Sequence, residues 1–257
     1  MRAICLALGA LLLVSTAHAN GTSADACSGS VSPPAGERIV ACGDLIRSGG
    51  SVYDAYVARA AAYVDAGNAD AAVADLTAAI ALSPDKAAAY SARGAIYLKQ
   101  EEFRDGLVDL DRALTIAPDD EDTLRARAFA WDSLGNYPAA IADYSTLLTL
   151  TGDPSYRYFR GFAYLRHDED DAALADFQAI ITSASPMLSG WGYRGRGQLH
   201  EKRGELAAAI GDYTAALAAD PDDDRAYAAR CRVEAAMGSA ADPALACTPP
   251  LITARAP

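Results

Sequence analysis

An arginine recurs along this chain at a nearly constant interval, and no other feature limits the possible folds as strongly. The steps between successive arginines are 34, 34, 33, 36 and 34 residues. The arginines are Arg59, Arg93, Arg127, Arg160, Arg196 and Arg230. An internal period of this length is typical of repeat proteins, in which each unit packs mainly against its neighbours in the chain.

Each of the first five arginines is followed 16 residues later by an aspartate and then a large side chain. These aspartates are Asp75, Asp109, Asp143, Asp176 and Asp212. Because the two residue types recur together, we expect them to form an ion pair across each unit, as an internal structural ladder. The alternative is a set of five anion-binding sites. The ladder is favoured because a partly buried arginine nearly always has a partner.

The spacing of apolar residues inside one unit is helical. Tyr90, Gly94 and Tyr97 fall at i, i+4 and i+7, and Gly106 and Leu110 continue the pattern further on. We expect two helices in each unit. Turns are predicted near Gly67, Gln100, Gly135, Asp168 and Gly204. Prolines that a second helix cannot pass are predicted to close the units at Pro84, Pro118, Pro186 and Pro221, with Gly152 and Pro154 in the third copy. One such hairpin cannot bury its apolar face alone, so the sequence predicts an all-α fold in which the hairpins stack as a right-handed α-solenoid.

This pattern resembles the tetratricopeptide repeat (TPR) family over about residues 53–248. Tyr90-x2-Arg93-Gly94-x2-Tyr97, followed by Gly106-x3-Leu110 and Pro118, matches the family spacing, and the match recurs five times. Arginine stands where the family usually has leucine, a variant that resembles exported bacterial members. The resemblance implies a right-handed solenoid of TPR hairpins. We expect five repeats at about 53–86, 87–120, 121–153, 154–189 and 190–222, a degenerate sixth repeat at 223–248 as a C-terminal cap, and a tail at 249–257.

The first 19 residues are typical of a secretory signal peptide. Arg2 gives a positive start, an apolar stretch follows from Ile4 to Val14, and Ala17-His18-Ala19 is a small-x-small cleavage site. The apolar stretch is too short to span a bilayer, so we expect cleavage after Ala19 and no membrane insertion afterwards. The mature protein is therefore predicted to be periplasmic or secreted.

Four cysteines remain after this cleavage, and an even number in an exported chain indicates disulfides. Spacings of 15 and 16 residues favour two local pairs, Cys27–Cys42 and Cys231–Cys247, over a link between the ends. Free buried thiols and a zinc site are the less favoured alternatives. We expect residues 20–52 to form an N-terminal extension and a capping helix at about 36–47. The first pair would hold the segment before this helix over it, and the second pair would hold the C-terminal cap.

The composition argues against several classes of function. A net charge of −12 is unsuited to binding nucleic acid without sequence preference, or to binding a membrane surface through a polybasic patch. The chain contains no GxxxxGK[ST], HExxH or GxSxG motif. The acidic runs at 119–122 and 222–224 are interpreted as helix starts rather than calcium sites. We therefore expect no enzyme activity, no catalytic residues, no metal and no cofactor.

The resemblance implies that an inner groove is lined by first-helix residues. The predicted ligand-binding residues are Arg125, Phe129, Tyr158, Phe162, Arg166, Trp191, Arg194, Gln198 and Lys202. Carboxylates of a bound peptide would meet the arginines, and apolar side chains would stack on Phe162 or Trp191. The alternative is that some of these side chains pack against neighbouring repeats.

The function expected from this groove is that of a non-catalytic adaptor that binds a segment of a partner protein. The alternative is an accessory factor of envelope assembly or cell-wall metabolism that binds a glycan or a cell-wall enzyme. A monomer is expected, because the stapled caps would cover both ends of the solenoid.

Overall fold

The computed structural model describes residues 23–28 and 33–237, and within these ranges it contains helices and no strand. The chain divides into two compact units, residues 1–84 and 85–257. The all-α fold class predicted from the periodicity is confirmed. The signal peptide at 1–19, Cys247 and the tail at 249–257 lie outside the described residues. No helix in the described part of the chain combines the length and apolarity needed to cross a membrane.

The described part of unit 1 consists of two N-terminal helices, the first of them short, and the first hairpin. Its helices are α1 (Ser23–Ser28), α2 (Ala35–Ser48), α3 (Val52–Asp65) and α4 (Ala69–Leu82). The core brings Cys27 and Cys42 together with Ala55, and Leu45 and Ile46 pack against them. The sulfur atoms of Cys27 and Cys42 are 2.08 Å apart, which joins α1 to α2 covalently. Helix α2 covers the residues expected to form the capping helix. The predicted bond between Cys231 and Cys247 cannot be described, because Cys247 lies outside the described residues.

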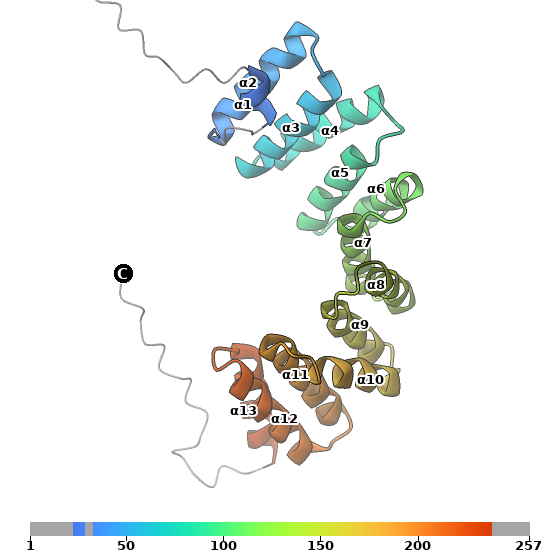
Figure 1. Ribbon diagram of the computed structural model, residues 1–257, viewed down its shortest axis with the longest axis vertical. Coiled ribbons are helices and arrows are strands. Elements are labelled where there is room, and N and C mark those ends of the chain that lie inside the picture. The colour runs from blue at the N-terminus through green and yellow to red at the C-terminus, as the bar shows by residue number, and fades with distance from the viewer. Residues whose placement is uncertain (1–22, 29–32, 238–257) are drawn as a thin grey trace, which may run out of the picture. The chain divides into compact units, whose positions relative to one another are not determined.

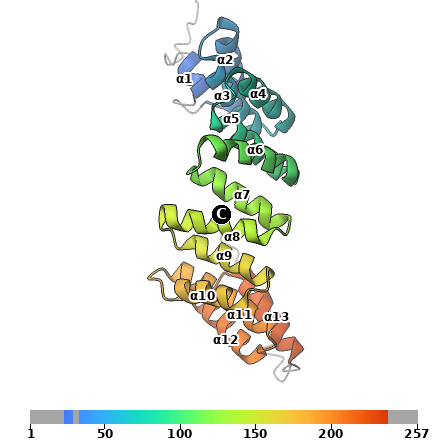
Figure 2. The same ribbon diagram turned by 90° about the vertical axis from the view of Figure 1, so that its right-hand side faces the viewer.

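Unit 2 contains four complete hairpins and the first helix of another. The helices are α5 (Ala87–Lys99), α6 (Phe103–Ile116), α7 (Glu121–Ser133), α8 (Tyr137–Thr151), α9 (Ser155–Arg166), α10 (Asp170–Ile181), α11 (Pro186–Lys202), α12 (Leu206–Ala219) and α13 (Asp224–Ala236). Each packs on the next, as Figures 1 and 2 show. In Figure 1, each of the first helices α5, α7 and α9 lies to the left of its partner, α6, α8 or α10.

The turns inside the hairpins occur where the sequence predicts them. Gly67, Gly135 and Gly204 adopt positive φ angles of 75°, 76° and 75°, and Asp168 does so at 61°. In the α5–α6 turn, the residue with positive φ is Glu101, at 62°, one position after the predicted Gln100. A left-handed residue at this point ends one helix and lets the chain reverse into the next.

The predicted boundary between the fourth and fifth repeats is wrong by four residues. Pro186 was expected to close the fourth unit and the fifth to begin at 190, but Pro186 opens α11. Proline is tolerated in the first turn of a helix, because its missing N–H would have no partner in the helix there. The Ser185 side chain also accepts a hydrogen bond from Leu188 N and so caps the start of the helix.

Small residues allow the paired helices to approach closely. A Cβ atom added to Gly94 would lie 2.9 Å from Leu110 Cγ, and one added to Gly106 would lie 2.8 Å from Leu98 Cδ2. The tightest case is the ring of Phe177 on α10, which is completely buried. Added Cβ atoms on Gly161 and Gly195 would lie only 2.7 Å and 2.4 Å from this ring. The Phe177 ring therefore fits between α9 and α11 only because both helices carry glycine.

Candidate functional site

The recurring arginines and aspartates form the predicted ladder in all five complete hairpins. Each arginine donates two hydrogen bonds to its aspartate, one from Nε and one from Nη2, at 2.7 to 2.9 Å. The aspartates are buried, and their exposed fractions lie between 3% and 6%. The hydrogen bonds to aspartate raise the pKa of the five arginines above its ordinary value. The ladder interpretation is confirmed, because each of these arginines is paired with an aspartate of its own hairpin.

Two of the ladder arginines also reach the preceding hairpin. Arg127 Nη1 donates to Asp111 at 2.8 Å, and Arg160 Nη1 donates to Ser145 at 3.0 Å. Asp111 and Ser145 each lie two residues after a ladder aspartate, on the second helix of the preceding unit. The same guanidinium group therefore closes its own hairpin and joins that hairpin to its neighbour.

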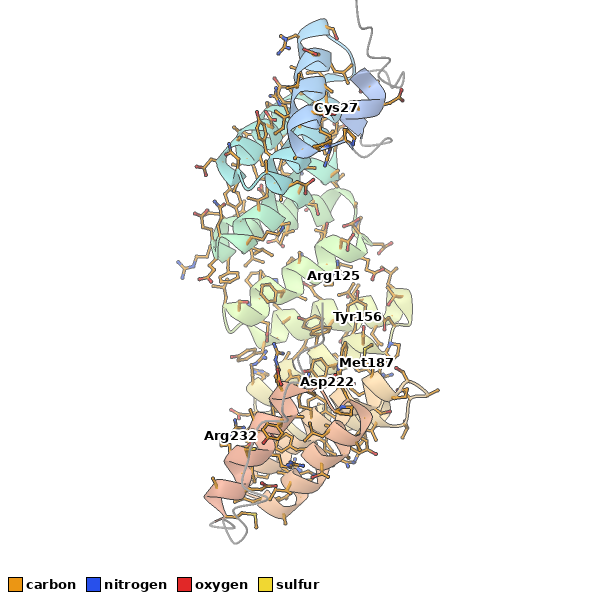
Figure 3. The ribbon with its side chains drawn as sticks, turned by 90° about the vertical axis from the view of Figure 1, so that its left-hand side faces the viewer. Cys27, Arg125, Tyr156, Met187, Asp222 and Arg232 are labelled. Atoms are coloured by element: carbon orange, nitrogen blue, oxygen red, sulfur yellow. A yellow bond between two sulfur atoms is a disulfide. The ribbon has the colours of Figure 1, made fainter. Side chains whose placement is uncertain are left out.

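A hollow of about 450 Å³ lies on the side of unit 2 formed mainly by first helices. Helices α7, α8, α9, α11 and α13 contribute its lining. The lining residues are Phe129, Asp132, Tyr144, Tyr158, Phe159, Phe162, Leu165, Arg166, Arg194, Gln198 and Arg225. Figure 3 looks onto this side of the chain and labels Arg125 on α7 and Tyr156 on α9. We call this hollow the aromatic groove.

Aromatic rings form most of the apolar surface of the aromatic groove. The Tyr158 ring lies 4.8 Å from the Phe162 ring and 5.4 Å from the Phe159 ring, measured between centroids. Phe159 also stacks on Tyr144 at 5.8 Å. Phe159 and Phe129 keep exposed fractions of 41% and 52%, so they offer apolar surface to a ligand. Burial raises the pKa of the Tyr144 hydroxyl above its ordinary value.

The two predicted arginines in the aromatic groove already have internal acidic partners. Arg166 pairs with Asp132, and its guanidinium lies 5.9 Å from the centre of the Phe162 ring. Arg194 is buried and donates to Asp223 at 2.5 Å and to the Tyr158 hydroxyl at 2.6 Å. The expectation that peptide carboxylates meet these arginines therefore overlooked acids of the chain itself.

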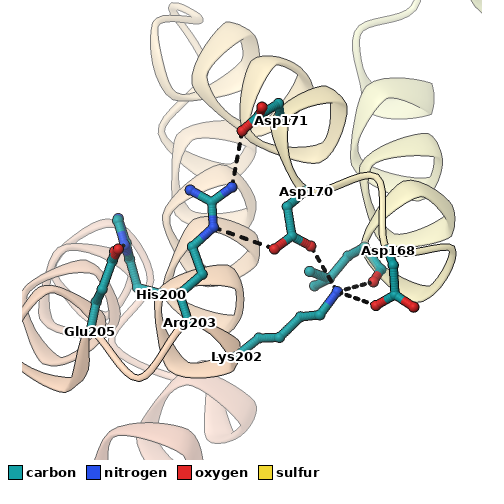
Figure 4. A network of polar contacts seen from close by, with 8 residues as sticks. Asp168, Asp170, Asp171, His200, Lys202, Arg203 and Glu205 are labelled. Carbon is teal, nitrogen blue, oxygen red and sulfur yellow. Dashed lines mark hydrogen bonds and ion pairs between the residues drawn. The ribbon is translucent and has the colours of Figure 1, made fainter.

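Three of the nine predicted residues do not line the aromatic groove. Arg125 is exposed and pairs with Asp122 on its own helix. Trp191 packs with Tyr158 at 5.3 Å, beside the core around Phe177. Lys202 donates to Asp168 and Asp170, each at 2.7 Å, and Figure 4 shows it in a network that also holds Arg203 and Asp171. The alternative of packing against neighbouring repeats thus describes Trp191.

The remaining six predicted residues do line the aromatic groove, and the structure adds five more. The added residues are Asp132, Tyr144, Phe159, Leu165 and Arg225. Arg225 could have been found from the repeat register. It lies five residues before Arg230, as Trp191 lies five residues before Arg196. Extending the groove positions into the shortened sixth unit would have included it.

The aromatic groove presents groups that can contact a ligand. Rings, guanidinium groups and the Gln198 amide supply apolar surface and hydrogen-bond donors. In the part of the chain that the structure describes, no group of three or more His, Cys, Asp or Glu side chains is placed to hold a metal ion.

Two family models match the chain, over three ranges of residues. A model described as TPR repeat matches residues 60–101, and one described as tetratricopeptide repeat matches residues 132–187 and 193–224. Together these matches cover just over half of the chain. Among curated proteins, no sequence matches it significantly.

Solved structures with the same fold share little sequence with this chain. A tetratricopeptide repeat protein from Parabacteroides merdae is 24% identical over 75% of this chain and 76% of its own, with a TM-score of 0.65. YrrB, described as a TPR protein with an unusual peptide-binding site, is 18% identical over 74% of this chain and 97% of its own, with a TM-score of 0.62. MamA is 18% identical over 69% of this chain and 95% of its own, with a TM-score of 0.55. At these identities the likeness shows the fold alone.

Proposed function

Because the chain belongs to the tetratricopeptide repeat family, we propose that it is a non-catalytic adaptor that binds an extended segment of a partner protein in the aromatic groove. The observation that carries this proposal is the exposure of Phe129 and Phe159 beside the hollow. Aromatic side chains are enriched at the centres of protein interfaces, where their burial supplies much of the binding energy. YrrB supports the proposal as an example of a peptide-binding TPR protein.

The proposed place of action is the bacterial envelope. The features of residues 1–19 that are typical of a signal peptide support export, as does the bond between Cys27 and Cys42, because disulfides persist in oxidising compartments. Protein recovered from the periplasm of its native host should begin at Asn20. A non-reduced digest of that protein should contain the linked Cys27 and Cys42 peptides. Mass spectrometry checks both expectations, and an uncleaved N-terminus in a cytoplasmic fraction would contradict export.

The proposed binding site is tested with a random-peptide library displayed on phage. The mature chain should enrich peptides, and a synthetic copy of an enriched peptide should bind at least about tenfold more weakly to the Phe129→Ala, Phe159→Ala double variant. Calorimetry measures the dissociation constants. The loss is expected because the variant removes both exposed rings. Because Phe159 also stacks on the buried Tyr144, an unchanged circular dichroism spectrum is required to show that the variant keeps its fold.

The matched control is Val108→Ala. Val108 is 69% exposed on α6 and does not line the aromatic groove, so its replacement should leave the dissociation constant unchanged. Equal binding by the double variant and by the wild type would show that the aromatic groove is not the binding site. Retention of the protein on isolated cell-wall sacculi, with no peptide enriched, would support the glycan-binding alternative.

A further inference from the structure

We infer that Arg225 binds the carboxylate of an acidic side chain in the bound segment. A neighbouring apolar or aromatic residue of that segment packs against the exposed rings of Phe129 and Phe159. This inference rests on the proposed function and deepens it. It replaces the sequence-based expectation that Arg125, Arg166 and Arg194 receive the carboxylates of a ligand.

The charges of the aromatic groove leave Arg225 as its uncompensated cation. Arg166 is paired with Asp132 and Arg194 with Asp223. Arg225 is exposed at the start of α13, and among the described residues its guanidinium group makes no ion pair. A ligand carboxylate could bind Arg166 or Arg194 only by displacing Asp132 or Asp223 and so breaking an existing ion pair. Arg225 can bind a carboxylate without the loss of such a pair.

A second unsatisfied donor lies on a neighbouring lining residue. Arg194 is only 8% exposed, and its Nε atom is buried without a hydrogen-bond partner in the described part of the chain. A buried N–H without a partner is unfavourable, so an acceptor oxygen that reaches it contributes to binding. A backbone carbonyl of an extended segment supplies such an oxygen without adding charge, once the side chains that cover Nε move aside.

These observations define the segment by its chemistry. Arg225 can pair with one carboxylate, so a segment with a single acid is preferred. A run of acids would be repelled by the carboxylates of Asp132 and Asp223. The rings of Phe129 and Phe159 require an apolar or aromatic neighbour on the same segment.

The experiment uses the same peptide library with three forms of the mature chain. The wild type should enrich peptides that combine one Asp or Glu with an aromatic or large apolar residue. The Arg225→Glu variant should retain the apolar preference but replace the acid by Lys or Arg. Arg125→Glu is the matched control, because Arg125 is also an exposed first-helix arginine but lies outside the groove lining, and its selected peptides should not change.

A charge-exchange cycle then measures the contact directly. The selected acidic peptide should bind Arg225→Glu at least about tenfold more weakly than it binds the wild type, and a Lys-substituted peptide should recover that loss on the variant. Unchanged circular dichroism and melting temperature show that the exposed substitution leaves the fold intact.

The possible outcomes separate the inference from the proposed function. If the wild type enriches no peptide, the proposed function fails. If Phe129- and Phe159-dependent peptides are enriched without an acid, or if Arg225→Glu selects the same peptides as the wild type, the proposed function stands and the role of Arg225 is wrong. Concentration-dependent dimerisation that Arg225→Glu abolishes would show that a second copy occupies the groove, which also overturns the inference.

Discussion

Replacing Asp109 with alanine is expected to lower the free energy of unfolding of unit 2 by about 2 to 4 kcal/mol. The substitution leaves the Arg93 guanidinium without the carboxylate that accepts its two hydrogen bonds, in a site where the Asp109 side chain is 5% exposed. Arg93 is itself 18% exposed, which places the expected loss below the upper end of the range for fully buried pairs. Urea unfolding followed by circular dichroism measures the change.

Two further variants identify the cause of this loss. Asp105→Ala removes an exposed acid from the first turn of the same helix and should cost less than about 1 kcal/mol. The double variant Arg93→Met, Asp109→Leu replaces the pair by apolar side chains of similar size and should recover most of the stability, because no uncompensated charge remains. An Asp109→Ala protein that unfolds at the same urea concentration as the wild type would show that the ladder contributes little to stability.

Replacing Gly195 with alanine is expected to destabilise unit 2 by about 2 kcal/mol or more, even though alanine is the better helix former. The new Cβ atom would lie 2.4 Å from the completely buried Phe177 ring, and a Cβ atom added to Gly161 would approach the same ring atom to 2.7 Å. The ring must shift to admit the methyl group, and a completely buried ring packed against two helices cannot shift without disturbing them. Thermal unfolding and urea titration measure the effect.

A glycine on the neighbouring helix provides the control with the opposite sign. Gly211 lies within α12, and a Cβ atom there would meet nothing within 4 Å. Gly211→Ala should therefore stabilise the protein by about 1 kcal/mol through helix propensity alone. Combining Gly195→Ala with Phe177→Leu should restore part of the lost stability if the ring is the obstacle. A stabilising effect of Gly195→Ala on its own would contradict the packing described for Phe177.

The sequence was sufficient to predict the helices, their turns and the ladder because these depend on spacing within one period. Arg93 and Asp109 are separated by the same 16 residues as the equivalent pairs in the other hairpins, so one interpretation applied to all five. The start of α11 was misjudged because proline ends a helix in its interior but is accepted at its first position.

The candidate site was predicted less completely because it depends on contacts between repeats. Asp132 lies 34 residues before Arg166, and Asp168 lies 34 residues before Lys202. Asp132 lies on α7 and Asp168 in the turn after α9, so an acid of the preceding hairpin pairs with the arginine and with the lysine that had been assigned to ligand binding. A comparison of charges at that separation would have indicated these pairs. The exposure of Phe159 depends on how α9 is rotated about its axis, which the period alone does not determine.

The guanidinium groups of Arg127 and Arg160 have a consequence for how an array of this kind comes apart. In a linear array, stability is the sum of an intrinsic term for each unit and a coupling term for each junction. These two side chains contribute to both terms, since each bonds within its own hairpin and to the hairpin before it. Opening the hairpin of α7 and α8 or that of α9 and α10 therefore weakens a junction at the same time. Loss of either of these hairpins therefore also removes a hydrogen bond that holds the hairpin before it.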